Sequence, residues 1–477
     1  MTHNKIPVRF GTAGSEVCPM VYGQFIEHLL NCIDGGVYEP TSAFADKDGF
    51  RTDVLEKSKA LQPPILRFPG GTVTCLYHWE DAVGPKETRF RRKNIIWGGE
   101  IETGFGTAEF VEYCRRIGTE PMICVNMPSG TAEEAGNWVE YCNGTGNTYY
   151  ANLRRSHGYE EPFNVKYWCI GNESYAEPDI GTQHDVNIYI RDAKEFIKFM
   201  KLTDRSIKTV LVGCDDMEWN RAVLDALHPM CDYFSYHHYS SEGTLGTYGP
   251  FAGEKGLIAS LKKVSDLLNE YPETVTDFNK WYRFPPRDHK IRIALDEWNI
   301  WNSNTTETYG LDAVYNWRDA VWVASALNDI LNCEAVEIGN MAQMVNVIAP
   351  ILTHEKGAYY QTIAYPLLAY RNDMLGKRVA AEFTSPVLNT PAGEIEAVNL
   401  CALQQPDGTL HIAAVNRDFE NAVTLSFNLT GTAEVTEWLA DKDSICTPEA
   451  SCVSTRTYTA PCEEIVLQPG AVCIIKA

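Results

Sequence analysis

Two glutamates occupy positions at which their carboxyl groups could perform acid–base chemistry. Glu173 comes just after an apolar run, Val165–Gly171, and Glu297 closes a second run, Ile293-Ala-Leu-Asp-Glu297. A buried carboxylate is costly unless it is paired or hydrogen-bonded, so each glutamate needs a reason to be there. One reason is structural, as a strand-end cap or an ion-pair partner. The other is chemical, because two facing carboxylates, one protonated and one ionised, are the minimum needed to hydrolyse a glycosidic bond.

Aromatic side chains accompany these glutamates. Four tryptophans lie beside the two motifs: Trp79, Trp168, Trp298 and Trp301. A flat ring suits the apolar face of a sugar, although a single tryptophan is more often part of a core. We predict that Trp298, directly after Glu297, contacts such a ring.

A pair of neighbouring histidines, His237 and His238, could suggest a metal site. No third ligand stands at a recognisable spacing, and adjacent side chains on a strand point in opposite directions. We therefore expect His237 to hydrogen-bond a carboxylate or a hydroxyl group. Neither a metal ion nor an organic cofactor is required by the chemistry of paired carboxylates.

The elements that must position these residues form a repeating pattern. Short apolar runs alternate with amphipathic helical stretches such as Arg318–Leu331, and a capping box, Thr131-Ala-Glu-Glu134, opens another helix. Eight runs are predicted strands: Val21–Ile26, Ile65–Phe68, Met122–Asn126, Val165–Gly171, Thr209–Gly213, Tyr233–Tyr236, Ile291–Asp296 and Ala335–Ile338. Their near-continuous hydrophobicity is typical of parallel strands covered on both faces.

Eight strand–helix repeats predict an α/β fold, a (β/α)₈ barrel. The alternative is an open doubly wound sheet, but no Gly-x-Gly-x-x-Gly phosphate-binding turn follows an early strand. In a barrel the active site lies at the C-terminal ends of the strands. Glu173 comes just after the fourth predicted strand and Glu297 directly follows the seventh, so the two should converge although they are far apart in the sequence.

The chain changes character after Asn372. Short β-rich segments separated by Pro-Gly and Asp-Gly turns predict an all-β, jelly-roll-like sandwich. The first residues also read as one strand that could pair with it. We therefore expect a catalytic barrel over residues 16–372 and a sandwich formed by residues 1–15 and 373–477.

The amino-acid composition excludes some classes of binding partner. The 477 residues include 41 Lys and Arg against 63 Asp and Glu, a formal charge of −22. Such a surface repels phosphate backbones and anionic lipids, so we expect no nucleic-acid and no membrane partner. The 15 cysteines include no Cys-x-x-Cys pair, and many sit in apolar runs where a thiol packs as a small hydrophobe. Without an apolar leader at the N-terminus, these features predict a cytoplasmic protein.

Several longer motifs resemble one enzyme family. They are Pro69-Gly-Gly71, Tyr77-His-Trp-Glu-Asp81, Gly84-Pro85, Tyr167-Trp-Cys-Ile-Gly-Asn-Glu173, Asp296-Glu-Trp-Asn-Ile-Trp301 and Met341-Ala-Gln-Met-Val-Asn-Val-Ile-Ala-Pro350. In this order they resemble the α-L-arabinofuranosidases of glycoside hydrolase family 51, from about Tyr22 to Tyr370. The resemblance implies a retaining double displacement on a (β/α)₈ barrel that carries a jelly-roll-like domain. It also implies a homo-oligomer, often a hexamer.

The resemblance assigns roles to individual residues. It makes Glu173 the acid/base, Glu297 the nucleophile, and Asn172 a partner of the sugar 2-hydroxyl. Further positions around the furanose are matched by Glu27, Arg67, Tyr239 and Gln343. It implies that Glu27 and Gln343 recognise hydroxyl groups, whereas Arg67 and Tyr239 hold the nucleophile.

The chain also departs from the family pattern. Thr72 follows Pro-Gly-Gly where the family commonly has asparagine, and it is a further candidate contact to the sugar. Ser174-Tyr-Ala-Glu-Pro178 lacks the usual glycine-tryptophan pattern, and His238 replaces a different polar residue. These differences bear on the sugar and the leaving group, because none of them changes the glutamate pair.

The sequence therefore predicts an exo-acting glycosidase that releases terminal, non-reducing α-L-arabinofuranosyl residues from oligosaccharides of arabinoxylan or arabinan. Two alternatives stay open at this point. The same barrel could act on a β-xyloside or a β-glucan, because related barrels share the acid pair. The chain could also be a catalytically silent sugar-binding protein.

Overall fold

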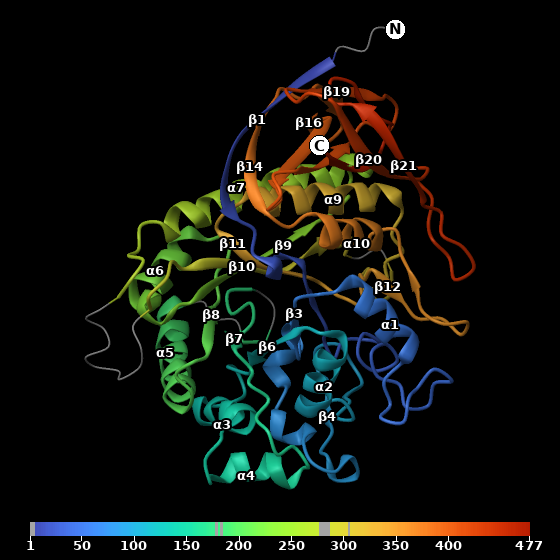
Figure 1. Ribbon diagram of the computed structural model, residues 1–477. Helices are drawn as coiled ribbons and strands as arrows, with labels where there is room; N and C mark the ends of the chain where they lie inside the picture. The colour runs from blue at the N-terminus through green and yellow to red at the C-terminus, as the bar shows by residue number, and fades with distance from the viewer. Residues whose placement is uncertain (1–4, 177–179, 182–184, 276–286, 304–305) are drawn as a thin grey trace.

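Eight parallel strands close into a barrel in the computed structural model, which describes residues 5–176, 180–181, 185–275, 287–303 and 306–477 (Figure 1). Their order around the barrel is β10-β11-β2-β3-β6-β7-β8-β9. The strands are β2 (Gly23–Phe25), β3 (Ile65–Phe68), β6 (Glu120–Val125), β7 (Tyr167–Ile170), β8 (Lys208–Leu211), β9 (Tyr233–Ser240), β10 (Arg292–Ile300) and β11 (Val336–Met341). Each overlaps one of the eight predicted runs, and the predicted (β/α)₈ barrel is confirmed.

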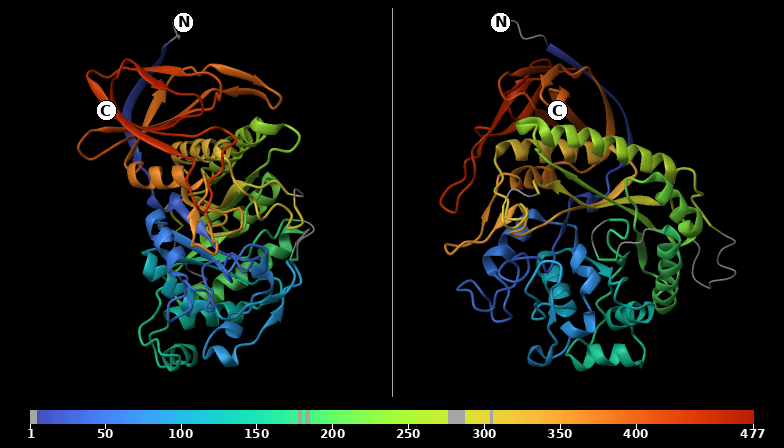
Figure 2. Two further views of the ribbon diagram at one scale, coloured as in Figure 1. Left: turned by 90° about the vertical axis from the view of Figure 1, so that its right-hand side faces the viewer. Right: turned by 180° about the vertical axis from the view of Figure 1, so that it is seen from behind.

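Helices follow each barrel strand and cover the outside of the barrel (Figure 2). They are α1 (Thr52–Leu61), α2 (Thr107–Ile117), α3 (Ala132–Asn143), α4 (Tyr149–Ser156), α5 (Val186–Thr203), α6 (Met217–Leu227), α7 (Gly249–Leu268), α9 (Trp317–Asn332) and α10 (Ala364–Asp373). The predicted N-cap at Thr131 is present, since its hydroxyl accepts the backbone N–H of Glu134 at 3.0 Å. Within the described ranges, no helix combines the length and apolar character needed to cross a bilayer.

The C-terminal region is an all-β domain, as predicted, and lies against α9 and α10 (Figure 1). Its nine strands follow the order β21-β20-β23-β18-β17-β14-β1-β19-β22. They are β1 (Lys5–Glu16), β14 (Lys377–Glu382), β17 (Val398–Gln404), β18 (Leu410–Asn416), β19 (Val423–Phe427), β20 (Thr432–Leu439), β21 (Ser454–Pro461), β22 (Ile465–Leu467) and β23 (Val472–Lys476). The strand at the start of the chain, β1, pairs antiparallel with β14 and parallel with β19. We infer domain boundaries near Glu16 and Asp373, where β1 and α10 end.

Shorter elements fill the connections. Three small hairpins pair β4 (Arg92–Lys93) with β5 (Glu100–Ile101), β12 (Ile351–Leu352) with β13 (Tyr359–Tyr360), and β15 (Val387–Thr390) with β16 (Gly393–Glu396). Six 3₁₀ helices span Pro19–Tyr22, Thr72–Leu76, Trp79–Ala82, Lys86–Thr88, His228–Met230 and Gly246–Tyr248. The long connection after β3, residues 69–106, contains three of these helices and the β4–β5 hairpin, and it covers part of the C-terminal face of the barrel.

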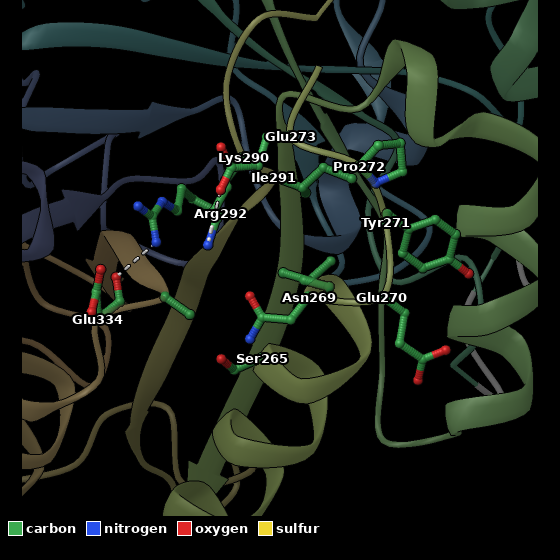
Figure 3. Close-up of a pocket in the computed structure, with 12 residues that line it drawn as sticks. Ser265, Asn269, Glu270, Tyr271, Pro272, Glu273, Lys290, Ile291, Arg292 and Glu334 are labelled. Atoms are coloured by element: carbon green, nitrogen blue, oxygen red, sulfur yellow. Dashed lines mark hydrogen bonds and ion pairs between the residues drawn. The ribbon is translucent and has the colours of Figure 1, made fainter. Parts of the chain in front are cut away.

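A cavity of about 580 Å³ opens at the opposite, N-terminal end, between the end of α7 and the starts of β10 and β11 (Figure 3). Its lysine and arginine are both paired with carboxylates. Lys290 lies 3.2 Å from Glu273, and Arg292 lies 3.1 Å from Glu337. None of the predicted site residues lines this cavity.

A buried carboxylate, Asp232, ties the N-terminal ends of the strands to α5. It accepts hydrogen bonds from Lys201 Nζ at 2.8 Å and from the backbone N–H of Thr209 at 2.9 Å, and it lies 3.2 Å from His289. Burial opposes its charge, but Lys201, His289 and Lys208 outweigh burial and hold the pKa of Asp232 far below its usual range. A depressed carboxyl pKa stabilises the fold above the unfolded-state pKa of about 3.9, and this contribution is lost as the pH falls below it.

We expect Asp232→Asn to lower the free energy of unfolding at pH 7 by about 3–5 kcal/mol, because Lys201 would stay buried without its partner. The difference from the unmodified protein should shrink below about pH 4, where the folded state gains less from ionised Asp232. Urea unfolding at several pH values measures this. If Asp232→Asn lowered the free energy of unfolding by the same amount at pH 3 and at pH 7, the depressed pKa of Asp232 would be contradicted.

Candidate active site

A tight turn at the end of β7 presents Glu173. Gly171 has φ +86°, and a side chain there would place its Cβ 2.9 Å from Met127 Sδ. Glu173 itself has φ +41°, a left-handed conformation that is uncommon for a residue with a side chain. Such backbone conformations persist where the surroundings enforce them, and they concentrate at functional sites. The turn therefore places the Glu173 carboxylate by backbone geometry.

An irregularity in β10 brings two consecutive acids to the same side. The register with β9 shifts between Ala294 and Glu297, and the register with β11 shifts between Leu295 and Trp298. In a regular strand neighbouring side chains point to opposite faces, whereas a bulge re-aims one of them. As a result, Asp296 and Glu297 both reach Arg67 of β3. Sequence analysis placed Glu297 at the end of its strand, but β10 continues for three residues beyond it.

Arg67 is the centre of the site. Its Nη1 donates to Glu297 Oε1 at 2.6 Å and its Nη2 donates to Asn172 Oδ1 at 2.7 Å, while Nε lies 3.4 Å from Asp296. The guanidinium also stacks over the ring of Phe25, 4.9 Å from the centroid. Burial opposes its charge, but Asp296 and Glu297 outweigh burial and raise the pKa of Arg67. One fully buried cation thus orients groups from β7 and β10.

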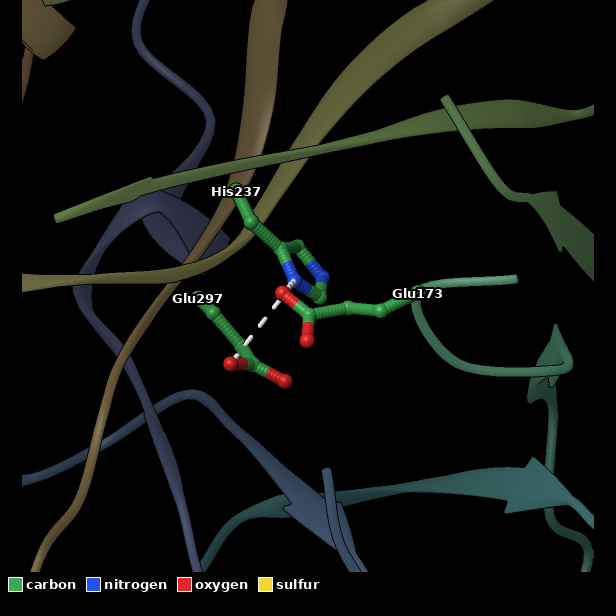
Figure 4. A group of neighbouring side chains, drawn as sticks. All are labelled: Glu173, His237 and Glu297. Carbon is green, nitrogen blue, oxygen red and sulfur yellow. Dashed lines mark hydrogen bonds and ion pairs between the residues drawn. The ribbon is translucent and has the colours of Figure 1, made fainter. Parts of the chain in front are cut away.

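His237 on β9 is the second cation (Figure 4). Its Nδ1 lies 2.8 Å from Glu173 Oε1 and 3.7 Å from Glu297 Oε2, and its Nε2 lies 3.4 Å from Asp296 Oδ1. Burial alone would lower the pKa of His237, but Glu297, Asp296 and the hydrogen bond to Glu173 raise it well above its usual value. Its ring is therefore an imidazolium at neutral pH, as expected for a histidine that hydrogen-bonds a carboxylate.

Glu173 and Glu297 meet across one opening. One oxygen of each carboxylate and one ring nitrogen of His237 lie within 4.8 Å of one another. Burial would raise the pKa of Glu173, but the hydrogen bond and charge of His237 outweigh it and lower the pKa. The sequence-based prediction that the two carboxylates converge is fulfilled. Retaining glycosidases place their carboxyl groups about 5–5.5 Å apart, and inverting enzymes about 6.5–9.5 Å.

These three residues are also the one group in the described part of the chain that could geometrically hold a metal ion. His237 argues against such a role. Its ring nitrogens already face carboxylates, Nδ1 that of Glu173 at 2.8 Å and Nε2 that of Asp296 at 3.4 Å, whereas a metal ligand must present a deprotonated nitrogen to the ion. The imidazolium supplies the positive charge that an ion would otherwise bring.

Other predicted residues surround this centre. Tyr239 donates its hydroxyl to Glu297 Oε2 at 2.7 Å. Glu27 accepts the backbone N–H of Val73 at 3.0 Å and the side-chain amide of Gln343 at 2.8 Å. Burial raises the pKa of Glu27 to about 8. Gln343 Oε1 is buried and has no hydrogen-bond partner among the described residues, so an acceptor remains for a ligand.

Trp298 does not form the expected platform. Because of the bulge at Asp296 and Glu297, it points out of the barrel and packs 6.2 Å from Trp322 of α9, with 1% of its surface exposed. Trp79 and Trp168 are likewise buried, and both pack against Trp138. Of the four tryptophans, Trp301 is partly exposed and lies edge-to-face with Tyr239, at 5.6 Å between ring centroids.

The departures from the family pattern fall around the site. Thr72 is buried at the start of a 3₁₀ helix, directly after the glycines that pack against Glu27. His238 points away from the carboxylates and its Nε2 contacts Ser240 Oγ at 3.1 Å. Within the segment 174–178, residues 177 and 178 lie outside the described residues.

Sequence reasoning did not propose Asp296 as a site residue. Ser235 donates its hydroxyl to Asp296 at 2.5 Å, and burial of Asp296 is offset by Arg67 and His237, so that its pKa is lowered. The only available signal was a second acid beside Glu297 in an apolar run. A regular strand would have turned it to the other face.

We predict that His237 keeps its proton at pH values above the ordinary histidine pKa of about 6.5 in the unmodified protein and loses its proton at a lower pH in Glu173→Gln, where one facing carboxylate is neutral. Side-chain NMR of histidine-labelled protein measures both titrations, with His237→Asn identifying the signal. A neutral His237 ring at pH 7 in the unmodified protein would refute this electrostatic account.

Comparison with known proteins places this site in a family. A profile described as "Alpha-L-arabinofuranosidase 1 domain" matches residues 57–248, and one described as "Alpha-L-arabinofuranosidase C-terminal domain" matches residues 296–453. Among curated relatives, a probable α-L-arabinofuranosidase C of Aspergillus flavus is 35% identical, over 90% of this chain and 88% of its own. An intracellular exo-α-(1→5)-L-arabinofuranosidase of Acetivibrio thermocellus is 32% identical, over 87% and 86%.

Solved structures agree with these matches. The α-L-arabinofuranosidase of Thermotoga maritima, solved as an arabinose complex, superposes with a TM-score of 0.88 at 34% identity, covering 99% of both chains. The family 51 α-L-arabinofuranosidase of Thermotoga petrophila gives the same TM-score, identity and coverage. These relatives favour the first of the sequence-based readings over a β-xylosidase or a β-glucanase. Sequence, fold and the paired glutamates together show that this chain belongs to the α-L-arabinofuranosidases of glycoside hydrolase family 51.

Proposed function

We propose that this enzyme is a retaining, exo-acting α-L-arabinofuranosidase that releases terminal, non-reducing arabinofuranosyl residues from oligosaccharides of arabinoxylan or arabinan. The observation that carries the proposal is the approach of Glu173 and Glu297 to within 4.8 Å of each other. This spacing suits direct attack by a carboxylate and leaves too little room for the water molecule of an inverting mechanism.

In the first step, Glu297 attacks the anomeric carbon while Glu173 protonates the departing glycosidic oxygen. The sugar is then held as an ester of Glu297. In the second step, Glu173 removes a proton from water, which displaces Glu297 and restores the original anomeric configuration. Arg67 and Tyr239 contact both oxygens of Glu297, which supports their role in orienting the nucleophile.

The proton for the first step is supplied by the Glu173–His237 pair. In the resting site this proton stays on His237, because Glu173, Asp296 and Glu297 all surround the ring. As Glu297 bonds to the anomeric carbon, its negative charge falls, and the imidazolium loses part of the interaction that stabilises it. In the same step the proton passes across the 2.8 Å hydrogen bond to Glu173 and on to the departing glycosidic oxygen.

Buried polar side chains are the groups that would bind the sugar. Glu27, Asn172 and Gln343 are each at least nine-tenths buried, and Thr72 lies beside them. Enclosed donors and acceptors of this kind suit one terminal sugar more than a chain that runs through the site. The name of the Acetivibrio thermocellus relative, which specifies exo action, supports the same assignment.

Location and assembly are also part of the proposal. We propose a cytoplasmic enzyme, supported by the word intracellular in the name of that relative and by cysteines that form no disulfide among the described residues. We further propose a homo-oligomer, with a hexamer as the expected form. Light scattering of the purified enzyme tests the assembly.

A panel of aryl glycosides tests the reaction class. We expect fast release of the aryl group from the α-L-arabinofuranoside, and at least about tenfold slower release from the β-D-xyloside and β-D-glucoside, because a different ring leaves buried polar groups unpaired. NMR of the first product formed reports the anomeric configuration. Turnover of no glycoside would instead indicate a silent sugar-binding protein.

Glu297→Ala should lower kcat on the aryl α-L-arabinofuranoside on the order of 10⁴-fold or more, because no ester can form. Azide should restore part of the activity and give a β-arabinofuranosyl azide, since one displacement inverts the configuration. Glu337→Ala is the matched control, because Glu337 lies near the start of barrel strand β11 at the opposite end. Retained turnover in Glu297→Ala without azide would overturn the assignment.

Glu173→Ala should slow the hydrolysis of natural oligosaccharides by about 10²–10⁴-fold, and it should slow substrates with acidic phenol leaving groups far less. Such phenols depart without protonation. The measurement is kcat/KM across aryl arabinofuranosides of graded leaving-group pKa, with Glu134→Ala as the control. An equal loss on good and poor leaving groups would show that Glu173 is not the acid.

A further inference from the structure

A pair of thiols lies in the loop of residues 440–453, which joins β20 to β21. Cys446 Sγ and Cys452 Sγ are 3.6 Å apart. The loop turns back on itself between them, because the backbone N–H groups of Thr447 and Ala450 each donate to the other residue's carbonyl, at 3.0 and 3.3 Å. The two sulfurs are thus brought together by local backbone structure, and their separation is within reach of a small side-chain rotation.

This loop joins two strands of the all-β domain and contacts the barrel helix α9. The carbonyls of Ser444 and Lys442 each accept a backbone N–H from the first turn of α9, those of Trp317 and Arg318, both at 3.1 Å. These N–H groups have no partner inside a helix, so the loop acts as the N-terminal cap of α9. Tyr365 donates to Ser451 Oγ at 2.6 Å.

The two thiols differ in access. Cys446 is buried, with 4% of its surface exposed, whereas Cys452 is partly exposed. Cys452 also lines a cavity of about 600 Å³ together with Phe419, Lys442 and Pro469. A small disulfide can therefore enter and meet Cys452 first, with Cys446 directly behind it.

We propose that Cys446 and Cys452 form a reversible disulfide, made by exchange with a small disulfide such as oxidised glutathione, that locks the cap of α9. The Cys452 thiolate attacks one glutathione sulfur, forms a mixed disulfide and expels a glutathione thiolate. The Cys446 thiolate then attacks the Cys452 sulfur and expels the second. The two protein protons end on two glutathione molecules, so the protein dithiol is oxidised as one glutathione disulfide is reduced.

The exchange should be slow at neutral pH. Burial and the neighbouring Cys446 raise the pKa of Cys452 to about 12, so little thiolate is present. At pH values below the pKa, each increase of one pH unit raises the thiolate fraction about tenfold. The rate of thiol–disulfide exchange should therefore rise about tenfold between pH 7 and pH 8. The bond closes a short ring within the loop and restricts the unfolded chain, which should slow thermal inactivation.

The test is incubation of the full-length enzyme with oxidised glutathione, followed by alkylation under denaturing conditions and peptide mapping. We expect the peptide that contains Cys446 and Cys452 to lose two hydrogens and both alkylation sites. Cleavage after Glu449 should leave two fragments that separate only after reduction. The oxidised enzyme should keep its kcat and lose activity at high temperature at least about twofold more slowly, and dithiothreitol should reverse this.

Single variants test the order of the steps. Cys446→Ser should stop at a stable mixed disulfide on Cys452, and Cys452→Ser should not react, because Cys446 is shielded. Cys333→Ser, which removes another partly exposed thiol, should behave as the unmodified protein. The proposal is overturned if both thiols of the unmodified protein remain open to alkylation, or if its mixed disulfide persists. It is also overturned if Cys452→Ser reacts with oxidised glutathione as fast as the unmodified protein does.

Discussion

The active site depends on one buried guanidinium. Arg67 of β3 binds Glu297 and Asn172, lies 3.4 Å from Asp296, and stacks on Phe25, so groups from three other barrel strands or their ends meet around it. Removing such a cation would leave neighbouring carboxylates without compensation, which is far costlier than losing a surface ion pair. Its planar fork also sets directions that a lysine could not, because two donors are aimed at once. Stability and catalytic geometry therefore rest on the same side chain.

Two local backbone distortions make this arrangement possible. The left-handed turn at Gly171 and Glu173 ends β7, and the bulge at Asp296 and Glu297 interrupts β10. Each distortion turns a carboxylate toward the barrel axis. A regular strand or helix would direct the same carboxylate elsewhere. The charges are then balanced within the site by Arg67 and His237. A protonated histidine among three carboxylates is a store of one proton that the reaction can draw upon.

The sequence predicted the barrel strands well because strands buried on both faces are apolar at nearly every position, a pattern that few other elements produce. It also predicted which glutamates converge, since parallel strands of a barrel end at one face. It could not reveal the bulge, because the extra residue leaves no mark in composition. For that reason Trp298 was assigned to the sugar although it faces α9, and Asp296 was overlooked. In the C-terminal domain, apolar and polar residues alternate too weakly in edge strands such as β21 for the sequence to identify them as strands.

The path of β1 has a consequence for biosynthesis. This strand leaves the ribosome before the whole barrel, yet its partners β14 and β19 are made after it. Until then β1 presents unpaired backbone groups on both sides, and such edges readily join other chains. Its alternating polar residues keep most of its length hydrophilic during this wait. Strands β14 and β19, made after the barrel, thus complete the sheet that β1 began before it.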